Sequence, residues 1–203
     1  MELTSWLALL AVVSVGAISP GPSLAVVMRN TLAGGRGHGV ATALGHGLGV
    51  GLYALITALG LAVLVTRYAL VFDVIRYGGA LFLAWLGIKA LLAKKTPPLP
   101  TTTAAPALAR RQGAFEGFMI AFLNPQLAVF FVALFSQFVT ADTSAIPSVI
   151  MMLTAGGVDA LWYVLVALVL SRGPVLAWLN SKAVWIDKLT GMILLALAIK
   201  IIW

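Results

Sequence analysis

Cysteine is absent from this chain of 203 residues, and charge is scarce: only 9% of the residues are Asp, Glu, Lys or Arg, whereas 62% are hydrophobic. Without cysteine the chain has no thiolate nucleophile, no thiol redox centre and no disulfide. A soluble domain carries about a quarter charged residues, so this composition excludes an ordinary soluble protein. We therefore predict an all-α integral membrane protein.

The charge that is present is mostly positive, with 13 Lys and Arg against 6 Asp and Glu and a net charge of +7. Such an excess can indicate nucleic acid, but here the basic residues cluster between apolar runs, as determinants of membrane topology do. We expect membrane lipid and no nucleic acid among the partners. The N-terminus also lacks the positive region and small-residue cleavage site of a signal peptide, so we expect the first apolar run to remain as a span.

Six apolar runs have about the 20 residues that a helix needs to cross a bilayer. They are Leu3–Met28, Gly39–Val65, Ile75–Leu92, Gly117–Val139, Ile146–Leu170 and Val184–Trp203. The sixth is the weakest, because Asp187 and Lys188 fall in its first turn. Most of the Lys and Arg residues lie in or beside the first, third and fifth connections. The positive-inside rule therefore predicts that connections 1, 3 and 5 are cytoplasmic and that both termini lie outside.

Residues 96–112 divide the chain into two halves of three spans, residues 1–95 and 113–203. The dividing segment is rich in proline and threonine and is predicted to be a flexible cytoplasmic linker. Residues 75–91 align with residues 186–202, matching Ile75 with Ile186 and Lys89 with Lys200. Chance is the alternative in such apolar sequence. If the halves are repeats, an odd number of spans in each inverts the second half in the membrane.

The first predicted span is interrupted by Ser19-Pro20-Gly21-Pro22. Two prolines around a glycine remove backbone donors and clash with the preceding turn, so a helix cannot continue unbroken. The alternative is a simple kink that helps helices to pack. Freed carbonyls at membrane depth must instead face protein, ligand or water, and we expect this segment to line a substrate cavity.

A second interruption, Asn124-Pro125-Gln126, falls in the fourth span. Two amides buried without partners would cost a few kcal/mol, so we expect them to face the interior of the bundle. A structural hydrogen bond between helices is the alternative. Broken helices 1 and 4, in matching positions of inverted halves, are the sequence pattern of a secondary transporter with its site near the midplane.

Asp159 lies near the middle of the fifth span, after Gly156-Gly157. An intramembrane carboxylate is costly and usually marks an ion or proton pathway. Asp159 could bind the ammonium group of a substrate, carry a coupling proton, or alternate between the two. The alternative is a neutral acid that is hydrogen-bonded to a neighbour.

Two further residues are candidates on weaker grounds. His46, between Gly45 and Gly47 in the second span, could relay protons, although a lone histidine is more often a hydrogen-bonded packing residue. Arg36 sits in a glycine-rich turn that lacks the preceding strand and the Gly-Lys-Ser/Thr pattern of a phosphate loop. We expect Arg36 to be a topology anchor or a gate contact.

The ordered motifs resemble those of the lysine exporter (LysE/RhtB) family of amino-acid efflux proteins. They are Ser19–Pro22 followed by Gly35-Arg36, Gly39, Gly45 and Gly49; Phe122–Gln126 with Phe130-Phe131; and Asp159 with Trp162-Tyr163. The resemblance covers nearly the whole chain, although His46 has no clear place in the family pattern. It implies a six-span protein of the bacterial inner membrane that exports amino acids or close analogues in exchange for protons and can form a homodimer.

Together these features predict a transporter for a small zwitterionic substrate, with no cofactor and no metal. A single central carboxylate favours a neutral amino acid such as homoserine, threonine or leucine. Export of a cation or metal ion is the runner-up, although one carboxylate, one histidine and no cysteine make a poor metal cage. The spans carry no Gly-x-Ser-x-Gly, His-Glu-x-x-His or paired catalytic aspartates, so we do not expect an enzyme. A purely structural subunit would leave the two breaks and the acid without a purpose.

Overall fold

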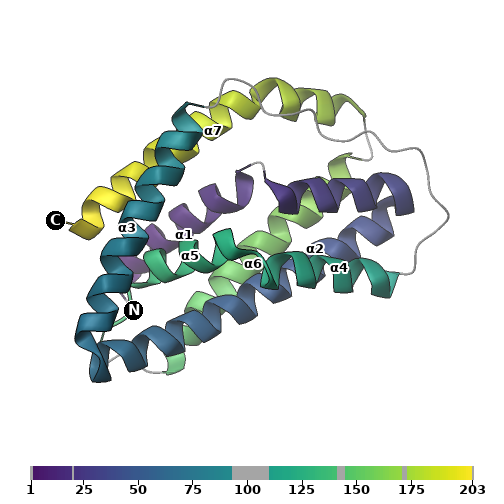
Figure 1. Ribbon diagram of the computed structural model, residues 1–203. Coiled ribbons are helices and arrows are strands. Elements are labelled where there is room, and N and C mark those ends of the chain that lie inside the picture. Colours follow the sequence, from purple (N-terminus) through teal and green to yellow (C-terminus); the bar gives the residue numbers. More distant parts are fainter. Residues whose placement is uncertain (1, 20, 93–109, 141–144, 171–172, 203) are drawn as a thin grey trace.

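The computed structural model describes residues 2–19, 21–92, 110–140, 145–170 and 173–202, and in these ranges it contains helices and no strands. The helices form an elongated bundle (Figure 1). Their bounds are α1 Leu3–Ile18, α2 Pro22–Arg67, α3 Ala69–Leu91, α4 Arg110–Phe122, α5 Pro125–Phe135, α6 Ala145–Leu170 and α7 Gly173–Ile202.

The predicted break in the first span is confirmed. Helix α1 ends at Ile18, Ser19 and Gly21 have extended backbone, and α2 begins with Pro22 at its first position. Proline is favoured there because its missing N–H would have no helical partner and its fixed φ suits the helix. Pro20 lies outside the described residues.

Helix α2 reverses direction at Gly35, whose φ of 77° and ψ of 177° are open in practice only to glycine. Asn30 Nδ2 lies 3.0 Å from Thr42 Oγ1, whereas twelve residues of straight helix would span about 18 Å. The two parts of α2 thus run back alongside each other (Figure 1). We had expected a connection from Arg29 to the start of the second span at Gly39. That expectation was wrong, because helix extends on both sides of a turn centred on Gly35.

The break predicted in the fourth span is also confirmed. Helix α4 ends at Phe122, and α5 begins at Pro125 after a bend of 59°. Asn124 has extended backbone, and its Oδ1 accepts a hydrogen bond of 2.9 Å from the backbone N–H of Gln126. The side chain of Asn124 therefore caps the N-terminus of α5.

Other predicted boundaries were too conservative. Only Tyr68 separates α2 from α3, and α7 already begins at Gly173 rather than at Val184. The predicted linker lies outside the described residues up to position 109, but its last three residues, Arg110–Gln112, belong to the first turn of α4. Polar residues near these helix ends had suggested loops, whereas packing against neighbouring helices extends the helical structure through them.

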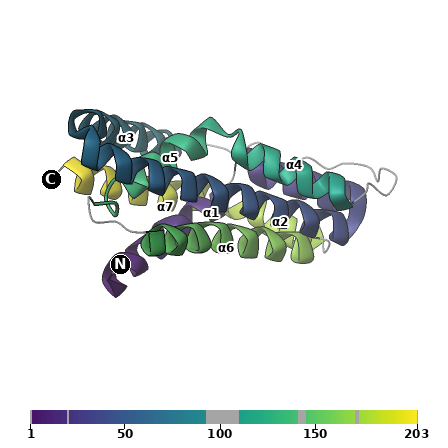
Figure 2. The same cartoon turned by 90° about the horizontal axis from the view of Figure 1, so that it is seen from below.

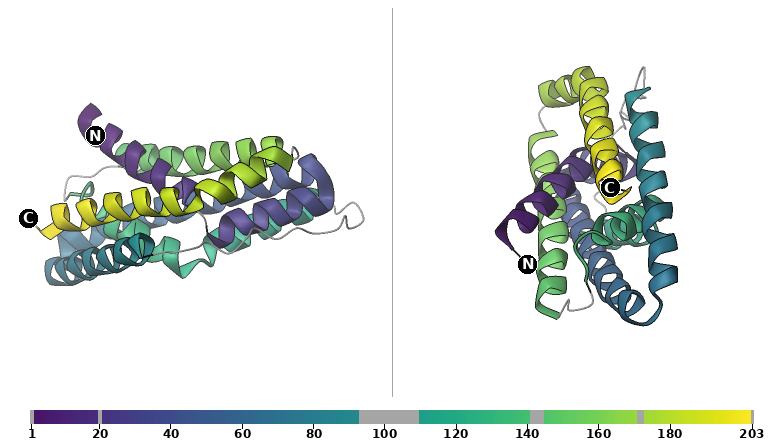
Figure 3. Two further views of the ribbon diagram at one scale, coloured as in Figure 1. Left: turned by 90° about the horizontal axis from the view of Figure 1, so that it is seen from above. Right: turned by 90° about the vertical axis from the view of Figure 1, so that its left-hand side faces the viewer.

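Two helix pairs cross where glycines face each other. A Cβ atom on Gly47 of α2 would lie 2.7 Å from the carbonyl oxygen of Gly156 in α6, and a Cβ atom on Gly156 would lie equally close to the carbonyl oxygen of Gly47. Gly87 of α3 and Gly191 of α7 have the same reciprocal relation. Glycine allows this close backbone approach. Figure 2 shows the second part of α2 between α6 and α4, and the end-on view in Figure 3 shows α3 beside α7.

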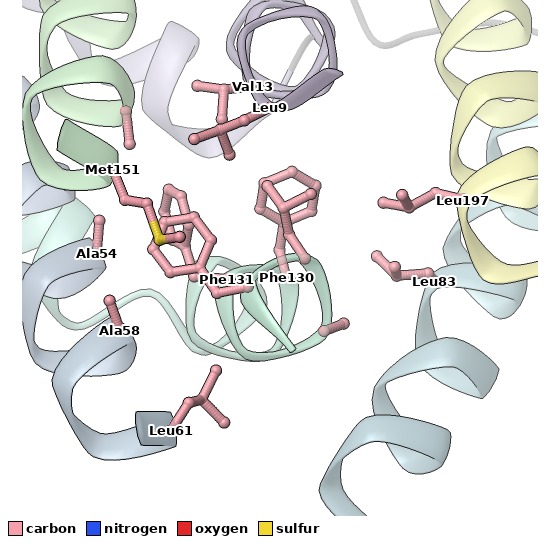
Figure 4. Close-up of a cluster of buried hydrophobic side chains, with 14 of the residues drawn as sticks. Leu9, Val13, Ala54, Ala58, Leu61, Leu83, Phe130, Phe131, Met151 and Leu197 are labelled. Atoms are coloured by element: carbon pink, nitrogen blue, oxygen red, sulfur yellow. The ribbon is translucent and has the colours of Figure 1, made fainter. Parts of the chain in front are cut away.

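The apolar core is built around α5, which lies in the interior of the end-on view (Figure 3). Phe130 and Phe131 point from α5 toward Leu9 and Val13 of α1 and Met151 of α6 (Figure 4). Their rings are in edge-to-face contact, 5.4 Å between centroids. The core therefore fixes α5, and with it the second break, against α1 and α6.

The outer surface is apolar, as lipid contact requires. Leu48, Leu81 and Leu161 are each at least two-thirds exposed. By length and composition, three helices of the described ranges can cross a membrane, namely Pro22–Leu64, Leu70–Leu91 and Ala145–Val169, and the bent pair α4 and α5 can form a fourth span. This total counts α2 as one span, although its two parts run in opposite directions. The arrangement of six spans in two inverted repeats stays a prediction.

Candidate functional site

The two helix breaks meet at one cavity of about 110 Å³. Ser19, Gly21 and Pro22 line it from the first break, and Asn124 and Gln126 line it from the second. The sequence predicted that these five residues form a cavity, and the structure brings them together around one. The side chain of Pro125 is not described, and Pro20 lies outside the described residues.

The N-termini of α2 and α5 both open into this cavity. The first amides of a helix have no partner within the helix and carry its positive dipole end. At α5 the side chain of Asn124 already accepts from the N–H of Gln126. At α2, Gly21 provides no side-chain cap, so this N-terminus is the less satisfied of the two. Anions are stabilised at such ends.

A buried acid and base face the helix ends. Asp159 Oδ2 of α6 lies 2.6 Å from His46 Nδ1 of α2, and both residues line the cavity. Their side chains are 8% and 1% exposed. The other ring nitrogen of His46, Nε2, is buried and has no hydrogen-bond partner among the described residues. The two residues that the sequence proposed for proton coupling thus form a single hydrogen-bonded pair.

Other polar residues of the cavity were missed as site residues. Ser23, Tyr163 and Thr190 line it, and Thr190 Oγ1 has no partner among the described residues. The Tyr163 ring packs edge-on against His46, 5.0 Å between centroids. Tyr163 had been noted only as part of a motif around Asp159; its position one turn further along α6 was the signal that could have placed it in the site.

Apolar side chains complete the wall of the cavity. They come from six helices and are Val13 and Ala17 of α1, Val50 of α2, Leu86 of α3, Leu127, Phe130 and Phe131 of α5, Ala155 of α6, and Leu194 of α7. Such a lining suits a small molecule whose polar head is bound at one end and whose side chain is apolar or uncharged.

Arg36 is not part of this cavity. It is exposed and begins the second part of α2, directly after the turn at Gly35. A nearby polar cluster that the sequence did not predict joins α2 to α4 instead. Arg29 and Glu116 form an ion pair of 2.7 Å, and Asn30 donates to the same carboxylate. Glu116 is one of only six acidic residues in the chain, and this rarity was its only signal.

No group of three or more His, Asp or Glu side chains in the described part of the chain could hold a metal ion. The arrangement instead places two helix N-termini, an acid and an imidazole around a small space. These groups can bind an anion and a cation of one molecule side by side, and the acid can exchange a proton with its neighbour.

The family model for LysE type translocators matches residues 14–203. The chain belongs to this LysE family. A membrane protein of Vibrio cholerae is 30% identical over 79% of this chain and 78% of its own. The homoserine/homoserine lactone efflux protein of Salmonella typhimurium is 30% identical over 68% of this chain and 66% of its own. The threonine efflux protein of Escherichia coli is 27% identical over 93% and 92%.

No solved structure matches the chain significantly. As a LysE translocator, the protein is a membrane protein of a family whose named relatives export amino acids. The resemblance drawn from its motifs is thereby confirmed.

Proposed function

We propose that the protein exports amino acids with neutral side chains from the cytoplasm in exchange for protons. The observation that carries this proposal is the cavity in which two helix N-termini face the buried His46–Asp159 pair. The named relatives support the amino-acid class, since two of them are efflux proteins for homoserine and for threonine.

The substrate carboxylate binds at the helix breaks. The uncapped N-terminus of α2 offers amides and a positive dipole end, and the hydroxyls of Ser19 and Ser23 lie along the same part of the wall. The capped N-terminus of α5 contributes the side-chain amides of Asn124 and Gln126. Half-helix ends that receive a substrate carboxylate are a recurring device of secondary transporters.

The substrate ammonium competes with a proton for Asp159. When the ammonium binds, the carboxylate is needed in its charged form; when the substrate has left, a proton can take its place and return to the cytoplasm. His46 Nδ1, 2.6 Å from Asp159 Oδ2, is placed to hold or pass that proton. One site that accepts either a proton or a cationic group, but not both, couples the two flows in opposite directions.

The apolar wall favours an uncharged substrate side chain. Phe130, Leu127 and Leu194 surround the space beyond the polar groups, and Asp159 is the only acidic residue that lines it in the described structure. A second cation in the substrate would be desolvated there without a partner. Homoserine, threonine or leucine therefore fit better than lysine. Export of a metal ion is not favoured, because the named relatives export amino acids.

An inverted repeat in a bacterial inner membrane remains our interpretation of the architecture. The reciprocal glycine crossings support it, because Gly47 with Gly156 and Gly87 with Gly191 pair the second and third helices of one half with those of the other. The two breaks, each with proline at the first position of the following helix, support it as well.

The test is efflux from cells loaded with dipeptides that hydrolyse to single amino acids. Cells that express the protein should lose one or a few neutral amino acids faster than cells with an empty vector. An uncoupler should abolish the difference, and Asp159→Asn should reduce efflux to the vector level while the protein still reaches the membrane. Asp73→Asn, in α3 and outside the cavity, is the matched control and should export normally.

Undiminished efflux from Asp159→Asn would contradict the role of the acid. Efflux that persists with the uncoupler would contradict proton exchange while leaving amino-acid export intact. If no amino acid of the panel distinguishes the protein from the vector, the substrate class itself is wrong.

A further inference from the structure

A groove outside the cavity runs between the first part of α2 and α4. Its volume is about 670 Å³, and its walls are mainly apolar. From α2 come Pro22, Val26 and Arg29; from α4 and the break that follows come Phe115, Glu116, Met119, Ile120, Leu123 and Asn124. Pro22 and Asn124 line the central cavity as well, so the groove adjoins the cavity at the two helix breaks.

The charged end of the groove lies two helical turns from the breaks. Arg29 follows Pro22 by seven residues and Glu116 precedes Leu123 by seven, so each lies about 10 Å along its helix from the cavity. Arg29 Nη2 and Glu116 Oε2 pair there at 2.7 Å. The positive-inside rule places this end on the cytoplasmic side, together with Arg36 and Arg110.

The two members of the pair are held unequally. Both oxygens of Glu116 accept from neutral amides, Oε2 from Asn30 at 3.0 Å and Oε1 from Gln112 at 3.1 Å. Asn30 is buried and also donates to Thr42 at 3.0 Å. The Arg29 side chain is 50% exposed. Apart from its bond to Glu116, it makes one hydrogen bond in the described structure, in which Nε donates to Asn30 Oδ1 at 3.2 Å. Glu116 is therefore fixed in place, whereas Arg29 can turn away.

We infer that this pair is a first binding site for the zwitterionic head of an α-amino acid on its way to the cavity. The substrate carboxylate takes the place of Glu116 on the Arg29 guanidinium, and the substrate ammonium takes the place of Arg29 on the Glu116 carboxylate. Charge complementarity identifies the occupant, because the pair presents one cation and one anion side by side, as an amino acid does. The apolar walls then accept the side chain.

The inference rests on the proposed function, and it adds a site that the cavity does not include. It also explains why an ion pair lies at the end of a mainly apolar groove. A pair that only joins α2 to α4 would gain little from its half-exposed position. A pair that opens by exchange for the substrate needs both the exposure of Arg29 and the fixed position of Glu116.

The first experiment measures uptake into inside-out vesicles, where the cytoplasmic face is outside. Arg29→Gln and Glu116→Gln should each raise KM about tenfold, the loss of roughly one charge-assisted hydrogen bond, and leave Vmax within about twofold. Arg29→Lys keeps the charge and should restore most of the affinity. Arg111→Gln changes an exposed arginine of α4, the helix of Glu116, that lies outside the groove; this variant should behave like the wild type.

The second experiment uses the absence of cysteine from the chain. Phe115→Cys, at a groove position of α4 that is 63% exposed, leaves Arg29 and Glu116 intact. It should react with a membrane-impermeant maleimide in inside-out vesicles, and the exported amino acid should slow that reaction at least threefold. Arg111→Cys should react at the same rate with and without the amino acid. Because labelling is read from the protein itself, it does not require the variant to transport.

The outcomes separate this inference from the proposed function. If the wild type transports an amino acid but the Arg29 and Glu116 variants keep its KM, or labelling of Phe115→Cys is unaffected by substrate, the groove site is refuted and the proposed function stands. If added phospholipid protects Phe115→Cys and the amino acid does not, the groove holds lipid and the inference is refuted. If the wild type moves no amino acid, the proposed function fails first.

Discussion

Two pairs of a basic and an acidic side chain in the described structure have almost the same separation. His46 and Asp159 lie 2.6 Å apart and Arg29 and Glu116 lie 2.7 Å apart. Their surroundings differ, because the first pair has side chains 1% and 8% exposed and the second 50% and 28%. Distance alone therefore does not tell what a pair does; burial decides what it costs to separate its members.

In the buried pair, protein encloses both side chains almost completely. His46 is enclosed by Tyr163 and by α6, and Asp159 lies at the wall of the cavity. Removing one partner of a buried pair is strongly destabilising. In the exposed pair, solvent and the amides of Asn30 and Gln112 can serve Glu116 when Arg29 leaves. The first pair is suited to hold a proton in a fixed place, and the second to exchange partners.

The largest difference should appear when each acid keeps its charge but changes length. Asp159→Glu adds a methylene to a closely packed site, where overpacking costs about 1–3 kcal/mol and displaces the carboxylate. Export should fall to a tenth or less. Glu116→Asp shortens a partly exposed side chain and should change export by about threefold at most. Efflux rates at equal expression compare the two, and equal losses would show that burial does not separate the pairs.

A smaller but clear difference should appear in the stability of the purified protein. His46→Leu leaves Asp159 buried without its partner and should lower the free energy of unfolding by about 3 kcal/mol. His38→Leu is the matched control, because His38 is equally buried and neither of its ring nitrogens has a partner among the described residues. Its replacement should be neutral or stabilising. Thermal unfolding in detergent measures both, and equal losses would mean that the His46 bond contributes nothing beyond packing.

The smallest effect is expected for Arg29→Gln. An exposed ion pair contributes about 0–1 kcal/mol, and Glu116 keeps its two amide donors. The free energy of unfolding, measured in the same way, should therefore change by less than about 1 kcal/mol. In the wild type, the contribution of this pair should vanish in about 1 M salt, where charges are screened within about 3 Å. A loss as large as that of His46→Leu would place the pair among the structural contacts of the bundle.

Local sequence signals predicted the parts of the site that depend on local chemistry. Proline and glycine in Ser19–Pro22 and in Asn124-Pro125 break helices wherever they occur, and both breaks are present. Asp159 was identifiable because a carboxylate in an apolar run is rare. These features need no knowledge of the rest of the chain.

Features that depend on distant contacts were not predictable in this way. The pairing of His46 with Asp159 joins residues 113 apart, and that of Arg29 with Glu116 joins residues 87 apart. Nothing in the neighbouring residues indicates either partner. The length of the turn at Gly35 was also predicted wrongly. Arg36 and His38 were expected in a connection between two spans, whereas the chain reverses at a single glycine with positive φ and helix continues on both sides of it. The packing of distant helices determines these pairings and this turn, and short stretches of a single sequence do not reveal that packing.

The reciprocal glycine crossings restrict how this sequence can vary over evolutionary time. Of its 20 glycines, Gly60, Gly78 and Gly157 face open space and can be replaced one at a time. Gly47 and Gly156 cannot, because a methyl group on either one meets the carbonyl of the other. A change at one position cannot be rescued by a smaller residue opposite, since none exists. Both positions must therefore remain glycine, whereas exposed apolar residues such as Leu48 and Leu161 are free to change.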